Sequence, residues 1–306
     1  MKCFDCPVKC GADRTTGVGA CKTGKDIVVS HADLHFWEEP CISGDTGSGA
    51  VFFGGCNLNC VFCQNAEISR TGAGTAVSER QLADIIFDLK RRGARNLNLV
   101  TPSHYAIRLS EFLRKIKPTL GIPVVYNSGG YDSQQAVEAL SDVVDVWLPD
   151  LKYGDGALAA KYGARADYCE VAQKAIKLML QKQPKAVFDK DGIMQKGVIV
   201  RHLVLPNNAE NTKRVLDFLA NTDKNVYVSL MAQYCPAGNA DKFSELRRTL
   251  KQREYDNAVD YFFNVGLKNG FMQEIASADK KYVPEFNMIK NRNSSSDNDK
   301  NLPSGK

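Results

Sequence analysis

Short apolar runs alternate with amphipathic stretches through most of the chain. Six runs have the length and apolar character of buried β-strands, at residues 49–54, 96–101, 122–127, 144–151, 198–205 and 226–233. Between them, apolar residues recur with helical spacing. Strands that alternate with helices in this way predict parallel strands joined by crossover helices.

Start signals mark several of the expected helices. Ser78 with Gln81 forms a capping box, which predicts a helix from Ser78 to about Arg92. Asp132 or Ser133 caps another, and the pair Asp191-Gly192 predicts a small hairpin between 185–190 and 192–197. The remaining helices are expected before residue 117 and at about 156–183, 211–221, 242–253 and 255–268. Six or more strand–helix units predict an α/β fold with a complete or partial (β/α) barrel, and a doubly wound open sheet is the alternative.

Composition divides the chain into three parts. Residues 1–47 are rich in Cys, Gly and charge with little periodicity, which predicts a loop-rich, Cys-rich N-terminal extension that binds metal. Residues 48–290 carry the alternating pattern of the barrel domain. Residues 291–306 are polar and are expected to be disordered.

Polar residues gather where the apolar runs end. In a parallel barrel the carboxyl ends of the strands meet at one face, and this face carries the active site. We therefore expect the site at these clusters, which are Gly55-Cys56, residues 101–104, residues 127–129, residues 150–152 and Arg201-His202.

Charge and targeting signals exclude several classes of protein. The net charge is +5, from 40 basic and 35 acidic residues, and the basic residues are scattered, so no nucleic-acid partner is expected. No apolar stretch has the length of a membrane span, and the N-terminus has no apolar core of a secretory signal. A cytoplasmic location is therefore predicted.

The distribution of the ten cysteines is uneven, since eight of them precede residue 64. Clustered cysteines in a large chain without a secretory signal favour metal binding or redox chemistry over disulfides. Cys56, Cys60 and Cys63 lie on one short loop directly after a strand. Three thiolates on a four-iron cluster leave one iron open, which indicates chemistry at that iron.

This triplet resembles the signature of the radical S-adenosylmethionine (radical SAM) superfamily, C-x3-C-x2-C after the first barrel strand, with an aromatic residue before the third cysteine, here Phe62. The resemblance implies a [4Fe–4S] cluster held by Cys56, Cys60 and Cys63. It also implies that S-adenosylmethionine binds the open iron. Reductive cleavage would then give a 5′-deoxyadenosyl radical that abstracts hydrogen from a substrate.

Longer segments narrow the resemblance to the PflX-type family, whose members are named putative pyruvate formate-lyase activating enzymes. They are residues 37–44, 47–49, 63–69, 100–105, 126–131, 148–153 and 201–206. The resemblance implies an activase-like oxidoreductase acting on a glycyl-radical protein or another peptide. It also implies a low-potential electron donor such as flavodoxin or ferredoxin.

One departure concerns the Gly-Gly-Glu run that often ends the second strand in such enzymes. This chain has Thr101-Pro102-Ser103-His104 there. Backbone carbonyls with Thr101 or His104 must therefore hold the ammonium group that the run usually holds.

Other candidate residues lie at the later strand ends. Asp150 and Lys152 point to the same side of a strand. The resemblance to the activating enzymes implies that Asp150 holds S-adenosylmethionine and that Lys152 faces the substrate or the methionyl carboxylate. The alternative is that the two residues form an ordinary salt bridge at the end of the strand. Asn127 and Ser128 are candidates for the ribose, or they form a simple turn. His202 either contacts S-adenosylmethionine or is a core histidine bonded to a backbone carbonyl.

Four more cysteines, Cys3, Cys6, Cys10 and Cys21, have the spacing C-x2-C-x3-C-x10-C. They can close a second metal site, and both structural zinc and a second iron–sulfur cluster fit. Cys41 can replace one ligand. Two other classes of protein are the alternatives to a radical enzyme. An iron–sulfur electron carrier or redox sensor would favour closed four-cysteine sites, and a zinc-stabilised binding module would hold no iron.

Overall fold

The computed structural model describes residues 2–274 and Phe286. Its centre is one ten-stranded sheet with the order β10-β9-β8-β6-β5-β4-β2-β1-β3, and β7 pairs with β8. Seven neighbouring strands run parallel: β2 (Ser48–Phe53), β4 (Leu97–Val100), β5 (Val124–Ser128), β6 (Val146–Pro149), β8 (Met194–Leu203), β9 (Tyr227–Met231) and β10 (Asn269–Met272). The predicted α/β fold is therefore confirmed, in its partial-barrel form.

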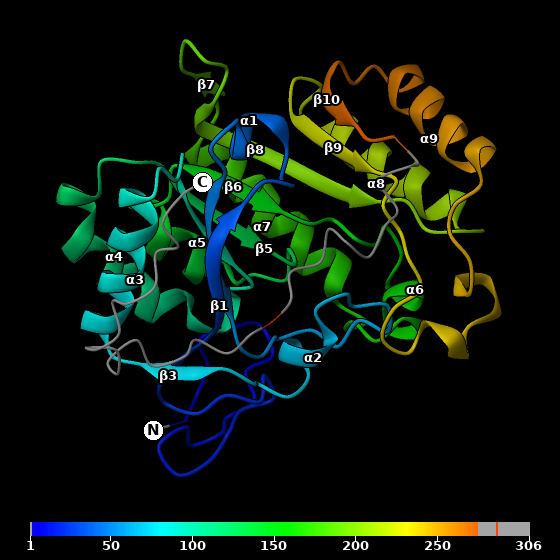
Figure 1. Cartoon of the computed structure of the whole chain (residues 1–306). Coiled ribbons are helices and arrows are strands. Elements are labelled where there is room, and N and C mark those ends of the chain that lie inside the picture. The colour runs from blue at the N-terminus through cyan, green and yellow to red at the C-terminus, as the bar shows by residue number, and fades with distance from the viewer. Residues whose placement is uncertain (1, 275–285, 287–306) are drawn as a thin grey trace, which may run out of the picture.

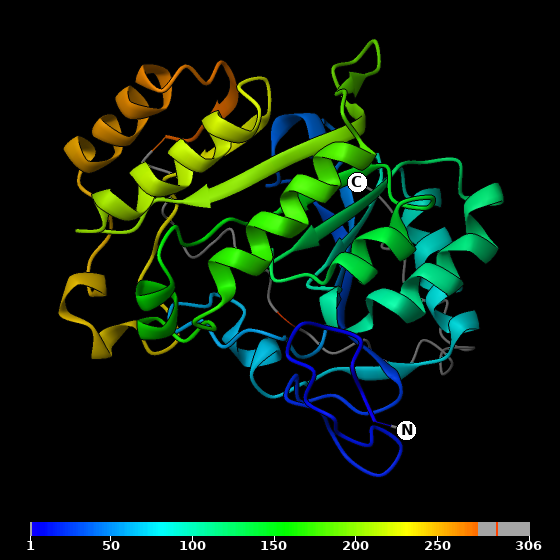
Figure 2. The same cartoon turned by 180° about the vertical axis from the view of Figure 1, so that it is seen from behind.

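Crossover helices connect these strands and cover one face of the sheet, as Figure 2 shows from behind. They are α3 (Glu79–Arg91), α4 (Ala106–Leu120), α5 (Gln134–Leu140), α6 (Gly156–Lys161), α7 (Tyr168–Lys182), α8 (Ala209–Thr222) and α9 (Gln252–Asn264). The capping box of Ser78 is confirmed, and the Ser133 side chain caps α5 by accepting from the Ala136 amide. Within the described residues, no helix is long and apolar enough to cross a bilayer.

The first strand corrects the expectation of a loop-rich segment over residues 1–47. β1 (Ile27–His35) pairs antiparallel with β2 and with β3 (Thr75–Val77). It extends the sheet beyond β2, and Figure 1 shows it on the side of the molecule away from the crossover helices. After β1, the short helix α1 (Pro40–Ser43) packs its Ile42 into the interior. The N-terminal segment therefore supplies one wall of the barrel.

Three further predictions have different outcomes. The hairpin is confirmed, because β7 (Val187–Phe188) pairs antiparallel with β8. The helix predicted over 242–253 is wrong, since this stretch contains two short 3₁₀ turns, η2 (Ala240–Lys242) and η3 (Ser244–Leu246), before α9 begins. The tail predicted over 291–306 lies outside the described residues.

Candidate active site

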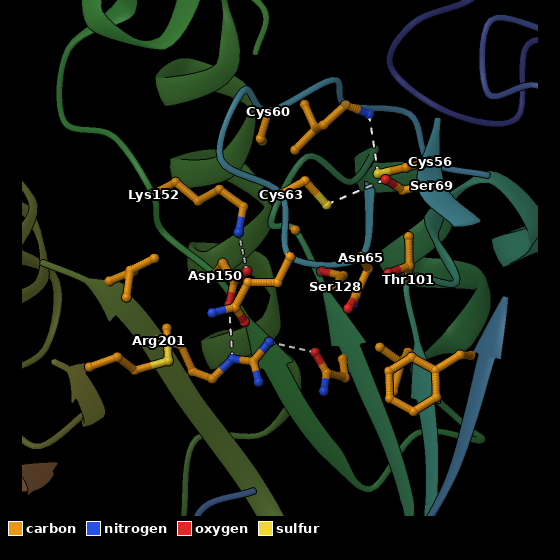
Figure 3. Close-up of a pocket in the computed structure, with 18 of the residues that line it drawn as sticks. Cys56, Cys60, Cys63, Asn65, Ser69, Thr101, Ser128, Asp150, Lys152 and Arg201 are labelled. Carbon is orange, nitrogen blue, oxygen red and sulfur yellow. Dashed lines mark hydrogen bonds and ion pairs between the residues drawn. The ribbon is translucent and has the colours of Figure 1, made fainter. Parts of the chain in front are cut away.

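A pocket opens at the carboxyl ends of the parallel strands, where the strand-end clusters meet. Its volume is about 240 Å³, and Figure 3 shows the cysteine loop above the strand ends. Its polar and thiol lining comprises His35, Glu38, Cys56, Cys60, Cys63, Gln64, Asn65, Ser69, Thr101, Asn127, Ser128, Asp150, Lys152, Arg201 and Gln233. Chain segments far apart in sequence therefore build one site.

The cysteine loop leaves β2 through Gly55, whose φ of +80° suits glycine. The Asn57 side chain anchors it by donating to the Tyr131 carbonyl at 2.7 Å. Burial raises the pKa of the Cys60 thiol to about 11, and Cys60 and Cys63 line the same pocket as Cys56. Such thiols gain from binding iron, because metal ligation stabilises the thiolate that burial disfavours.

Phe62 holds this loop against the barrel rather than projecting into solvent. Its ring packs edge-on against Tyr153, Tyr162 and Tyr234, at centroid distances of 6.4, 6.3 and 5.9 Å. Edge-to-face contacts of this kind are favourable. The aromatic residue of the cysteine signature thus fixes the position of Cys60 and Cys63 on either side of it.

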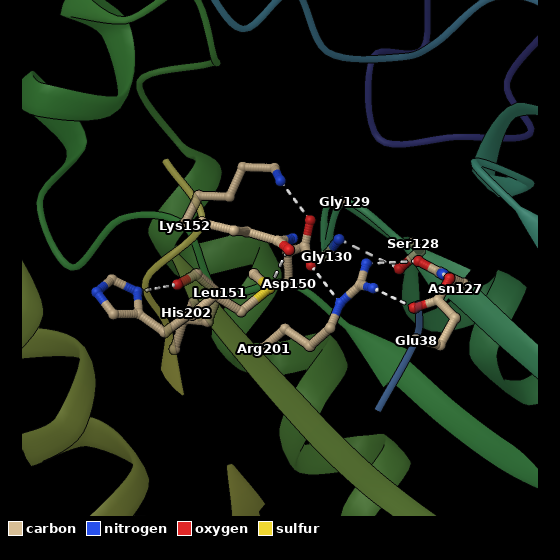
Figure 4. Close-up of polar contacts among 12 residues, drawn as sticks. Glu38, Asn127, Ser128, Gly129, Gly130, Asp150, Leu151, Lys152, Arg201 and His202 are labelled. Carbon is tan, nitrogen blue, oxygen red and sulfur yellow. Dashed lines mark hydrogen bonds and ion pairs between the residues drawn. The ribbon is translucent and has the colours of Figure 1, made fainter. Parts of the chain in front are cut away.

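A charged network forms the floor of the pocket, shown in Figure 4. The Arg201 guanidinium donates to Asp150 at 2.8 Å, to Glu38 at 3.1 Å and to the Asn127 side-chain oxygen at 2.6 Å. Lys152 forms an ion pair with the other oxygen of Asp150. Five polar side chains from four segments are therefore locked into one arrangement.

Burial and pairing act in opposite directions on these charges. Burial opposes ionisation of Asp150, but Arg201 and Lys152 outweigh it and hold the pKa of Asp150 below its usual range. Burial likewise opposes the ammonium of Lys152, and Asp150 together with Cys60 nonetheless raises its pKa. Both groups are thus charged at neutral pH.

Asn127 and Ser128, at the end of β5, line the pocket with their side chains already engaged. Asn127 donates to Glu38 at 3.0 Å, and Ser128 donates to the buried Asp132 at 2.5 Å. The Gly130 amide in turn donates to the Ser128 hydroxyl at 3.2 Å. This turn is rigid, and its position in the pocket is fixed by hydrogen bonds.

The two candidate histidines lie outside the pocket. His104 is buried beneath it, with Nε2 2.8 Å from the Gly54 carbonyl. His202 points away from the strand face that Arg201 occupies, as Figure 4 shows, with Nδ1 2.8 Å from the Leu151 carbonyl. Thr101, in contrast, lines the pocket in a left-handed conformation with φ +60°.

The four N-terminal cysteines form a separate group. Burial raises the pKa of the Cys6 thiol to about 11, and the nearby Cys21, Cys3 and Cys10 add to this effect. A carbon atom placed on Gly19 would lie 3.4 Å from the sulfur atoms of both Cys10 and Cys21. Within residues 2–274 and Phe286, no three His, Cys, Asp or Glu side chains stand close enough to hold a single metal ion.

Sequence reasoning missed part of the lining. Glu38 comes from the segment after β1, and although it stands within the resemblance at residues 37–44, the sequence assigned it no role in the site. Trp37 lines the same pocket and keeps 59% of its surface exposed. Leu203, Met231 and Gln233 close the far side at the ends of β8 and β9. In the sequence, only their position near the ends of predicted strands indicated that these three residues could line the pocket.

Comparisons with known proteins agree with this geometry. The family model described as "Radical SAM superfamily" matches residues 50–219, more than half of the chain. An uncharacterised protein of Methanocaldococcus jannaschii, MJ0674, is 29% identical over 268 residues, which cover 84% of this chain and 73% of that protein.

Two solved structures are similar to this chain, and the first of them shows the fold. Streptococcus suis SuiB, in its structure with the precursor peptide SuiA, has a TM-score of 0.51 at 16% identity, over 72% of this chain and 46% of that chain. This chain thus spans about half the length of SuiB. A domain of the pyruvate-formate lyase-activating enzyme of Bacteroides vulgatus has a TM-score of 0.43 at 13% identity, over 58% of this chain and 99% of that chain.

The family match begins in the strand that precedes the cysteine loop and extends into α8, so it spans the strands and loops that build most of the pocket. Membership implies a [4Fe–4S] cluster and S-adenosylmethionine, and three thiols that line one pocket are a donor set that suits such a cluster. On this match, the chain belongs to the radical SAM superfamily.

Proposed function

We propose that Cys56, Cys60 and Cys63 hold a [4Fe–4S] cluster and that the adjoining pocket binds S-adenosylmethionine for radical chemistry. The observation that carries the proposal is the convergence of these three thiols and the Asp150–Lys152 pair on one pocket. When bound, the two cofactors supply a one-electron cleavage of the C5′–S bond.

The residues of the pocket have separate roles in this proposal. Asp150 and Lys152 present a fixed pair of opposite charges that matches the ammonium and carboxylate of an amino acid. Thr101 offers its backbone carbonyl, and His104 supports that strand end from below by its contact with Gly54. Asn127 and Ser128 orient the ribose side, and His202 positions Leu151 from outside the pocket.

We further propose that the substrate is a peptide or protein, in the manner of the PflX-type activating enzymes. The exposed Trp37 beside the pocket offers an apolar contact surface for such a chain. SuiB, whose fold this chain shares, is bound to a precursor peptide in its structure. In the proposed division, residues 1–47 form a metal-binding extension, residues 48–290 the radical domain, and flavodoxin or ferredoxin supplies electrons.

The test is anaerobic reconstitution followed by an assay of 5′-deoxyadenosine with titanium(III) citrate as reductant. Wild type should form the product, whereas Cys56→Ala/Cys60→Ala/Cys63→Ala should form none. Cys169→Ser is the matched control, because its thiol donates to the Tyr153 carbonyl at 3.2 Å and a serine hydroxyl can do the same. Wild type that carries iron at the triplet but forms no product would instead identify an electron carrier or redox sensor.

A further inference from the structure

The N-terminal lobe, residues 2–26, is a series of loops that brings its four cysteines into one neighbourhood. The Cys3 amide donates to the Ala12 carbonyl at 2.9 Å, and the Gly11 amide donates back to the Cys3 carbonyl at 3.0 Å. Gly19 lies beside the sulfur atoms of Cys10 and Cys21. Hydrogen bonds between backbone atoms of the lobe therefore help to bring its cysteine thiols close together.

The lobe contacts the cysteine loop of the pocket through backbone atoms. The Cys56 amide donates to the Cys21 carbonyl at 3.3 Å. A side-chain carbon on Gly55 would lie 2.2 Å from that carbonyl oxygen, and one on Gly72 would lie 2.3 Å from the Lys22 carbonyl oxygen. Since both distances are far below van der Waals contact, the lobe approaches the loop as closely as glycine permits.

Arg14 fastens the lobe to the barrel. Its guanidinium is buried, donates to the His104 carbonyl at 3.0 Å and to the Thr23 hydroxyl at 2.9 Å, and lies 5.2 Å from the centroid of the Tyr105 ring. Displacing Arg14 would leave these buried acceptors without their donor, which opposes movement of the lobe. The lobe is therefore held in one position relative to Cys56.

We infer that Cys3, Cys6, Cys10 and Cys21 hold a second iron–sulfur centre that passes electrons to the centre held by the triplet. The route runs along Cys21, across its hydrogen bond to Cys56, and along Cys56 to the pocket. Four thiolates close an iron–sulfur site. Within the part of the chain that the structure describes, no three of these side chains stand close enough to hold a single metal ion, which argues against zinc, whereas the thiolates at the corners of a four-iron cluster stand farther apart.

This electron relay from the lobe centre to the triplet centre rests on the proposed radical function. Each electron that enters the lobe centre leaves it again. In each turnover a low-potential flavodoxin or ferredoxin loses one electron, which the lobe centre receives and passes on. The sulfonium of S-adenosylmethionine gains that electron, and the C5′–S bond breaks to give methionine and a 5′-deoxyadenosyl radical. The lobe centre ends each turnover in its starting state.

Metal content tests the site without any assay of turnover. Iron, sulfide and zinc are measured in the reconstituted full chain, in the triplet variant Cys56→Ala/Cys60→Ala/Cys63→Ala, and in the lobe variant Cys3→Ser/Cys6→Ser/Cys10→Ser. Two four-iron centres predict about eight irons in wild type and about four in each variant. The triplet variant should also give an electron paramagnetic resonance signal on reduction. Zinc, or no metal, in that variant would overturn the inference.

The relay is tested by the rate at which reduced flavodoxin bleaches the triplet cluster, which requires no S-adenosylmethionine. Gly72→Ala pushes the lobe away at Lys22, whereas Gly121→Ala is the matched control, with a similar φ of +67° and no lobe contact. Gly72→Ala should slow this reduction about tenfold, and Gly121→Ala should leave it unchanged.

Small reductants provide the second comparison, because titanium(III) citrate can reach the triplet through the pocket. The rate with titanium should stay within about twofold of wild type in Gly72→Ala and in the lobe variant. Equal flavodoxin rates in wild type and the lobe variant would overturn the relay. Failure of the proposed function looks different, because product would then be absent with titanium while both metal centres remain.

Discussion

At the scale of single residues, Arg201 explains how so many charges share one small pocket. Its guanidinium has five donors in a fixed plane, and it uses them on Asp150, Glu38 and Asn127. Lysine has three donors, but they radiate from one nitrogen and could not span these separate acceptors as the planar guanidinium does. Removing Arg201 would leave two buried carboxylates without their main partner, which makes it the central residue of the floor.

Thr101 is strained, because a β-branched residue with φ +60° is a steric outlier. We expect Thr101→Gly to raise the free energy of unfolding by about 1 kcal/mol, since glycine adopts this conformation without the clash. Urea unfolding of the chain checks this. Asn207→Gly is the control, because Asn207 has a similar φ of +57° and asparagine tolerates it. A less stable Thr101→Gly would mean that the side chain contributes more than the strain costs.

At the scale of elements, the ends of β5 and β6 fit together through Gly130. A side-chain carbon there would lie 2.0 Å from the Asp150 carbonyl oxygen, while one on Gly192, which has a nearly equal φ, would meet nothing within 4 Å. Gly192→Ala should therefore cost about 1 kcal/mol from backbone strain, and Gly130→Ala several times more. Urea unfolding compares the two variants. Equal losses would show that the strand ends can separate to admit a methyl group.

Patterns along the chain predicted the buried strands but failed where tertiary contacts decided the structure. β1 escaped notice because only its first half is continuously apolar, while His31, Asp33 and His35 alternate through the rest. Residues 242–253 have helical spacing of apolar side chains. However, the Tyr234 hydroxyl donates to the Leu246 carbonyl at 2.7 Å, which takes an acceptor that a continuous helix would use.

At the scale of the whole molecule, the cysteine triplet could be predicted because its spacing is local, whereas the floor of the pocket could not. Glu38 and Arg201 are 163 residues apart, and their contact depends on the path that the chain takes after β1. Alternation along β8 required one of Arg201 and His202 to face inward, but only the register of the strand decides which. The same limit applies to His104, whose place beneath the strand ends depends on the lobe that covers it.

Two buried histidines predict loss of stability of the whole fold in acid. Burial lowers the pKa of His104 and of His202 to about 4, from an ordinary value of 6.5. As the pH falls below 6.5, the unfolded chain binds these protons before the folded chain does. The stability that is present above pH 6.5 is therefore lost as the pH approaches 4, by about 2 kcal/mol per histidine at pH 5.

Urea unfolding of the metal-free chain at pH 7 and pH 5 measures this loss. The buried carboxyls Glu39 and Asp132 have the opposite effect. Burial raises their pKa, so their contribution to the stability of the folded chain falls as the pH rises. His202→Gln separates the two effects, since it removes one histidine and leaves both carboxyls. The difference in stability between pH 7 and pH 5 should shrink by about 2 kcal/mol in that variant. An unchanged difference would show that His202 takes up its proton without unfolding, through a rearrangement of its bonds to Leu151 and Thr212.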